Sequence, residues 1–237
     1  MKEQYILLHG ALHGGWCWQE LIPYLKQQKP QAQIYTPDLL GLGQKQGADL
    51  STVNLSAQIA DMKEYIQTLP PIKTTLVAHS YGALVALCLH EQMPERFHEV
   101  ILLDGLICDK GTKALDIWSE ELREIRVNEA IWHKNTLCFF PTQAKNLGVP
   151  ERFWQWMDAN LTPHPVACYQ EPMPLQKPLK YLHRIRYIQC YLPEYLTVTI
   201  SVAYLKMLLD WPITRVACDH EGLITEPELV CQAILNS

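Results

Sequence analysis

The sequence contains no stretch of about 20 apolar residues that could cross a membrane. Its first residues, MKEQYILLHG, pass from polar residues directly into a short apolar segment, without the apolar core and small-residue cleavage site of a secretory leader. It also has no cluster of basic residues, since 20 Lys and Arg are scattered against 25 Asp and Glu and the net charge is −5. A nucleic-acid backbone would find no positive surface to bind. We therefore expect a cytoplasmic protein that acts away from membranes and nucleic acids.

Closely spaced cysteines are absent as well. Eight cysteines are spread from Cys17 to Cys231, and no two are spaced as Cys-x-x-Cys. That distribution argues against a zinc site and against a compact disulfide scaffold. His9 and His13 are close in sequence, but no third ligand lies near them. We expect reduced, mostly buried thiols, no metal and no cofactor.

The chain has no internal repeat and no low-complexity segment. Its 237 residues are 48% hydrophobic and 19% charged, which supplies enough apolar side chains for one large core. We therefore expect a single globular domain over residues 1–237, and we leave a homodimer open.

Short apolar segments alternate with segments of helical periodicity. The apolar ones have the length and composition of buried parallel strands: 4–8, 33–36, 74–78, 99–103, 186–192 and 213–217. Apolar residues at helical spacing occur between them, in 18–27, 54–69, 82–92 and 194–209. The alternation predicts an α/β fold, a doubly wound, mostly parallel sheet with helices on both faces.

Residues 106–183 interrupt this alternation. They contain two helical stretches, 114–131 and 150–161, separated by Pro, Phe and Trp. We interpret the segment as a small helical cap inserted over the carboxyl ends of the strands, where such sheets bind ligands. The segment is rich in aromatic residues: Trp118, Trp132, Phe139, Phe140, Phe153, Trp154 and Trp156. Most of these rings should serve packing, and the rest should line a pocket for an apolar or aromatic small molecule.

The residues with the clearest chemistry are VAHSYGA, positions 77–83, where a predicted strand is followed by a small-x-Ser-x-Gly turn and an apolar helix. Small residues at 78 and 82 allow a strained turn that exposes the hydroxyl of Ser80 as a nucleophile. A serine hydroxyl needs a base to take its proton. His220 directly follows the last predicted strand, in the serine-then-histidine order that this kind of fold uses.

Acyl transfer also needs hydrogen-bond donors for the developing oxyanion, usually two backbone N–H groups. The N–H of Tyr81, the residue after the nucleophile, is one candidate. The glycine-rich segment HGALHGGW, positions 9–16, follows the first strand and can approach a ligand closely. The N–H of Ala11 is our second candidate.

Seven segments of the chain resemble the plant hydroxynitrile lyase and methyl-ester esterase group of α/β-hydrolases and its bacterial relatives. They are LLHGALHGGWCW, YTPDLLGLG, LVAHSYGALVA, VILLDG, LTPHPVACYQEP, RYIQC and CDHEGLITEP, which together run from near residue 5 to near residue 227. The resemblance implies the α/β-hydrolase fold, Ser80 as nucleophile, His220 as base, and Ala11 and Tyr81 as oxyanion donors.

The resemblance fails at the acid that completes the family's catalytic triad of serine, histidine and acid. The family's acid usually lies three residues past the Cys of RYIQC, and here that residue is Pro193. Glu194 lies one residue further and has a longer side chain, so we favour it as the partner of His220. Asp104, at the end of VILLD, is the alternative, and a chain with no triad acid is the third outcome.

The lyase members carry a Lys directly after the catalytic His and a Thr near the first-strand loop, whereas this chain has Glu221 and Ala11-Leu12 there. A carboxylate beside the base would oppose an anion such as cyanide, unless Glu221 is merely solvated in its loop. We therefore expect a serine hydrolase that cleaves a small, largely apolar carboxylic ester. The alternatives are a non-catalytic or weakly catalytic ligand-binding homologue and a hydroxynitrile-lyase-like enzyme.

Overall fold

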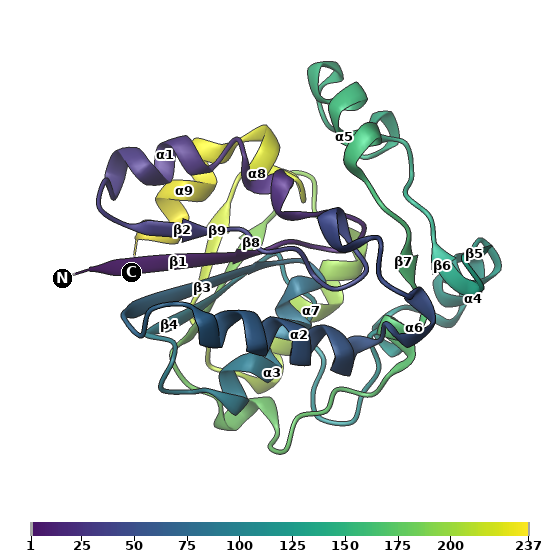
Figure 1. Cartoon of the computed structure of the whole chain (residues 1–237), viewed down its shortest axis with the longest axis horizontal. Helices are drawn as coiled ribbons and strands as arrows, with labels where there is room; N and C mark the ends of the chain where they lie inside the picture. The colour runs from purple at the N-terminus through teal and green to yellow at the C-terminus, as the bar shows by residue number, and fades with distance from the viewer. Residues whose placement is uncertain (1, 237) are drawn as a thin grey trace.

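Six parallel strands form the central sheet of the computed structural model, which describes residues 2–236 (Figure 1). Their order is β2-β1-β3-β4-β8-β9. The strands span Glu3–Leu8 (β1), Gln33–Tyr35 (β2), Lys73–His79 (β3), Glu99–Leu103 (β4), Ile185–Cys190 (β8) and Ile213–Val216 (β9). The predicted α/β fold with a mostly parallel sheet is confirmed. Most residues of the strands are apolar because both faces of the sheet are covered.

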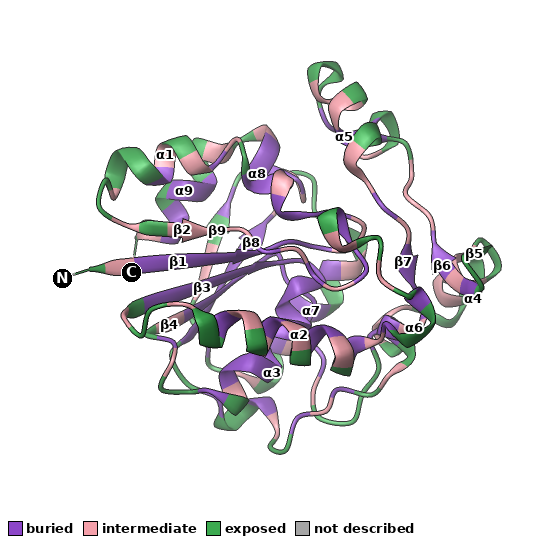
Figure 2. Cartoon of the chain, viewed as in Figure 1, coloured by how far each residue is buried: buried purple, intermediate pink, exposed green. Residues whose placement is uncertain are grey.

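Helices pack on the two faces and create two apolar cores. Leu55–Thr68 (α2), Gly82–Gln92 (α3) and Leu196–Leu208 (α7) contribute to one core. Ile22–Gln28 (α1), Gly222–Thr225 (α8) and Pro227–Leu235 (α9) contribute to the other. The strands between them are largely buried, as Figure 2 shows. Within residues 2–236, no helix combines the length and apolar character needed to span a bilayer.

The segment between β4 and β8 holds the short elements that we expected to form a cap. Its helices are Glu120–Asn128 (α4), Trp154–Asn160 (α5) and Ala167–Gln170 (α6). Three antiparallel strands accompany them: Ile131–His133 (β5), Thr136–Phe139 (β6) and His164–Pro165 (β7). Figure 1 shows β6, β7 and α4 beyond the carboxyl ends of β1 and β3.

The first predicted helix of this segment, 114–131, is wrong at both ends. The chain forms a short 3-10 turn at Ala114–Ile117, and α4 starts only after Ser119, whose hydroxyl accepts the N–H of Leu122 at 3.2 Å. After α4, Lys134 and Asn135 both adopt positive φ, 48° and 60°, and make the two-residue turn between β5 and β6. Turns of that kind match the twist of paired strands, so the apolar residues that follow continue as a hairpin instead of a helix.

Candidate active site

Ser80 lies on a strained turn between β3 and α3. Its φ is 51°, and its N–H donates to the carbonyl of Leu103 on β4 at 3.0 Å. The turn leaves no room at position 82, where an added Cβ would lie 2.5 Å from the carbonyl oxygen of His9. The small residue in the motif is therefore a steric requirement, and the strain is located at the residue with the predicted chemistry.

Ser80, His220 and Asp104 form a continuous line of hydrogen bonds. Ser80 Oγ lies 3.0 Å from His220 Nε2, and His220 Nδ1 lies 2.7 Å from Asp104 Oδ2. Asp104 is fully buried, and its other oxygen, Oδ1, accepts the N–H of Cys190 at 3.0 Å. Because a carboxylate only accepts, Nδ1 of His220 carries the ring proton and Nε2 is free to accept the proton of Ser80.

Glu194, which we favoured as the acid, does not lie beside His220. It is about half exposed, accepts from Gln189 Nε2 at 3.1 Å, and lies 3.8 Å from Arg215. The chain after β8 stays paired with the segment after β9, since the N–H of Leu192 donates to the carbonyl of Cys218 at 2.9 Å. That pairing carries residue 194 over β9, and the alternative, Asp104, occupies the position against His220 instead.

The two proposed oxyanion donors flank Ser80. Ala11 and Tyr81 both line the cavity above it, and neither N–H donates to a carbonyl in the turns and loops of residues 2–236. The loop after β1 comes so close that a Cβ on Gly10 would lie 3.0 Å from Ser80 Cβ. Leu12, with φ at 67°, completes this tight turn. The arrangement offers two free donors beside the nucleophile.

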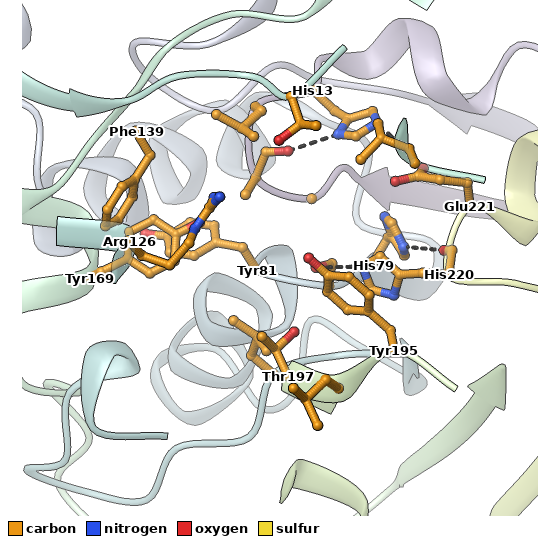
Figure 3. Close-up of a pocket in the computed structure, with 18 of the residues that line it drawn as sticks. His13, His79, Tyr81, Arg126, Phe139, Tyr169, Tyr195, Thr197, His220 and Glu221 are labelled. Carbon is orange, nitrogen blue, oxygen red and sulfur yellow. Dashed lines mark hydrogen bonds and ion pairs between the residues drawn. The ribbon is translucent and has the colours of Figure 1, made fainter. Parts of the chain in front are cut away.

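A second buried pair, His13 and Glu221, lies next to this group and was not anticipated from sequence. His13 Nε2 is 3.4 Å from Glu221 Oε2, and both side chains are almost completely buried. His13 Nδ1 is 2.7 Å from the carbonyl oxygen of Ala11, so the ring joins the oxyanion loop to the residue after His220 (Figure 3). The interpretation of Glu221 as a solvated loop carboxylate is therefore wrong. The HGALHGGW segment contained the partner, but sequence spacing could not show that Glu221 meets it.

Burial and charge shift the pKa values of His13 and Glu221 in opposite directions. Burial by itself would lower the pKa of His13, but the charge of Glu221 and the hydrogen bond to the carbonyl of Ala11 raise it above its ordinary value. Burial would likewise raise the pKa of Glu221, and His13 holds it well below its usual range. At the nearby His79, burial followed by the proximity of His220 lowers the pKa to about 3, and the opposing effect of Glu221 is smaller. These shifts favour a charged His13–Glu221 pair and a neutral His79.

The cavity above Ser80 has a volume of about 290 Å³. Its walls are mainly aromatic and aliphatic and come from the loop after β1, the segment between β4 and β8, and the start of α7. Tyr195, which precedes α7, stacks on the His220 ring with centroids 4.3 Å apart and planes at 19°. Such stacking fixes the plane of the His220 ring.

The family of the chain follows from its match to a family model. A model described as the alpha/beta hydrolase family matches residues 5–233. The chain belongs to the α/β-hydrolase family. It is 22% identical over 243 residues to a carbendazim hydrolyzing esterase of Nocardioides sp. (strain SG-4G), a match that covers 97% of each chain. It is 26% identical over 110 residues to methylesterase 1 of Arabidopsis thaliana, covering 46% of this chain and 41% of that protein.

Solved structures show the same fold over the whole length of this α/β-hydrolase. An extracellular α/β-hydrolase from a Paenibacillus species superposes with a TM-score of 0.83 at 18% identity, covering 98% of this chain and 97% of that one. Tomato methylketone synthase I, as an H243A variant, superposes with a TM-score of 0.81 at 17% identity, covering 99% and 97%. The predicted relationship to the plant methylesterase group of α/β-hydrolases is confirmed.

Proposed function

We propose that this α/β-hydrolase is a serine esterase that cleaves a small, largely apolar carboxylic ester through an acyl-enzyme on Ser80. The observation that carries the proposal is the line of hydrogen bonds from Ser80 through His220 to the buried Asp104. Relatives named as a carbendazim hydrolyzing esterase and a methylesterase support it.

In the first half of the reaction, Ser80 Oγ attacks the carbonyl carbon of the ester while His220 Nε2 takes its proton. The charge that develops on the carbonyl oxygen is accepted by the N–H groups of Tyr81 and Ala11. Asp104 stabilises the imidazolium that forms. When the intermediate collapses, His220 gives the proton to the departing alkoxide, which leaves as an alcohol.

In the second half, His220 takes a proton from water, and the resulting nucleophile attacks the carbonyl carbon of the acyl-enzyme. The same two N–H groups accept the second oxyanion. Collapse returns the proton to Ser80 Oγ and releases the carboxylic acid. The three triad side chains already lie in hydrogen-bond contact, so the reaction needs no rearrangement of the triad.

The binding-protein alternative loses the observation that favoured it, and the lyase alternative gains no support. The binding-protein alternative was based on the absence of the family's acid at position 193, which is Pro. Asp104 supplies a carboxylate instead, with Oδ2 2.7 Å from His220 Nδ1. In place of the lyases' Lys, the residue after His220 is Glu221, whose charge is already engaged by His13. That pair leaves no free cation there for cyanide.

A panel of small esters tests the proposal. We expect short acyl and aryl methyl esters to be hydrolysed and Ser80→Ala to reduce kcat to the background rate, with an unchanged circular dichroism spectrum as the control for folding. Release of cyanide and aldehyde from a cyanohydrin without ester turnover would favour the lyase instead. Binding of apolar esters with no turnover at all would favour a ligand-binding protein.

A further inference from the structure

One charged side chain of the cavity has no role in the reaction described above. Arg126, on α4, is the single Lys or Arg among the residues that line the cavity within 2–236. Its guanidinium lies 5.7 Å from the centre of the Phe139 ring, and its side chain is 31% exposed. A cation that lines a mainly aromatic and aliphatic cavity is available to a ligand.

The nearby acids do not neutralise Arg126. Glu129, the residue that follows α4, is 3.7 Å away and its side chain is 62% exposed, so the pair is weak and open to solvent. Glu221 is the single carboxylate that lines the cavity in the described residues, and it is already paired with His13. Arg126 therefore leaves a net positive charge at its end of the cavity.

A series of aromatic rings connects the Ser80 end of the cavity to Arg126. Tyr81, next to the nucleophile, is 5.0 Å from Tyr169 between ring centres. Tyr169 in turn is 5.1 Å from Phe139, the ring beside Arg126. Figure 3 shows Arg126 next to Phe139 and Tyr169, on the opposite side of the site from His220. An apolar body lying along these rings would join a reacting ester at Ser80 to a charged group at Arg126.

We propose that the preferred substrate is an ester whose far end carries a carboxylate, bound by Arg126, with an apolar or aromatic body between the two groups. The inference rests on the proposed esterase function and narrows its substrate class. A planar guanidinium pairs with a carboxylate through two parallel hydrogen bonds, which orients the ligand as well as attracting it.

Two pairs of esters test this proposal: monomethyl suberate against methyl octanoate, and monomethyl terephthalate against methyl para-toluate. In each pair the body is similar and only the carboxylate is added. We expect the wild type to prefer the acid-bearing ester, mainly through a lower KM. In Arg126→Met the ratio of kcat/KM for the charged over the neutral ester should fall about tenfold, and added salt should reduce the ratio in the wild type.

Arg123→Met is the matched control, because Arg123 lies on the same helix, pairs with Asp116 at 3.5 Å and does not line the cavity. It removes the same charge and should leave the ratio unchanged. An unchanged ratio in Arg126→Met, or an equal fall in both variants, would overturn the proposal.

Binding to Ser80→Ala, measured by calorimetry, separates this inference from the esterase function. We expect monomethyl suberate to bind this variant more tightly than methyl octanoate, and the difference to disappear when Arg126→Met is added. If the wild type hydrolyses neither ester but this difference is present, the esterase proposal fails and the anion site stands. Equal binding of the two esters to Ser80→Ala would refute the anion site whatever the turnover.

Discussion

Asp104→Asn is the substitution for which the structure gives the most definite expectation. Oδ1 of Asp104 accepts the N–H of Cys190 at 3.0 Å, and Oδ2 faces His220 Nδ1 at 2.7 Å. In the asparagine variant the backbone N–H of Cys190 still requires an acceptor, so the amide oxygen stays there. The amide NH₂ then points at His220 Nδ1 and donates to it.

That orientation reverses the proton arrangement of the histidine. Nδ1 must accept, so Nε2 carries the ring proton and can no longer take the proton of Ser80. The charge that stabilises the imidazolium is lost as well. In serine proteases, changing the triad Asp to Asn lowers kcat by about 10⁴. We expect a loss of about 10³ to 10⁴ here, with little change in thermal stability because the buried hydrogen bond to Cys190 is kept.

The assay is kcat on a chromogenic short-chain ester, with Glu194→Gln as the matched control. Glu194 lies at the surface beside Gln189 and Arg215, so its amide should lower kcat by less than about twofold. A large loss in Glu194→Gln beside a loss of less than about tenfold in Asp104→Asn would refute the assignment of the acid.

Three further outcomes follow from the same geometry. His13→Gln should lower the free energy of unfolding more at about pH 5–6 than at about pH 9. The raised pKa of His13 and the lowered pKa of Glu221 mean that the pair stabilises the fold where both are charged, and this contribution is lost as pH rises through the raised pKa of His13. Equal losses at both pH values in urea titrations would contradict this. Gly82→Ala should destabilise by about 1–3 kcal/mol despite alanine's better helix propensity, since its Cβ would meet the carbonyl of His9 at 2.5 Å; thermal melts that show no loss would disagree. Short-chain and aryl esters should be turned over better than long-chain triglycerides or peptides, because the cavity holds about 290 Å³; triglyceride or peptide hydrolysis as the main activity in a substrate panel would count against this cavity as the binding site.

The sequence identified the parts of the site that depend on local chain geometry. Ser80 and Tyr81 lie in one strand-turn-helix motif, so the positions of the proposed nucleophile and of the proposed donor beside it follow from a few consecutive residues. His220 lies in the loop after β9, and the order of elements placed it at the correct edge of the sheet. The sheet itself could be predicted because buried parallel strands are rich in apolar residues.

The acid depended on how distant segments approach each other, which no local pattern contains. Asp104 has a φ of 45°, a bend at the end of β4 that its sequence neighbours do not announce. The displacement of Glu194 follows from the pairing of Leu192 with Cys218, a contact between two loops. The pair of His13 and Glu221 required the same long-range information. The hairpin of β5 and β6 was missed because its strands have only three and four residues, too few to show a period of two.

The decisive measurement on Ser80 is labelling with a fluorophosphonate probe, because such probes react covalently with a serine that a neighbouring base has activated. We expect one labelled peptide, containing Ser80, by mass spectrometry of the wild-type protein, and no labelling in Ser80→Ala. Labelling that persists in Ser80→Ala, or a wild-type protein that hydrolyses esters without reacting at Ser80, would contradict the assignment of the nucleophile.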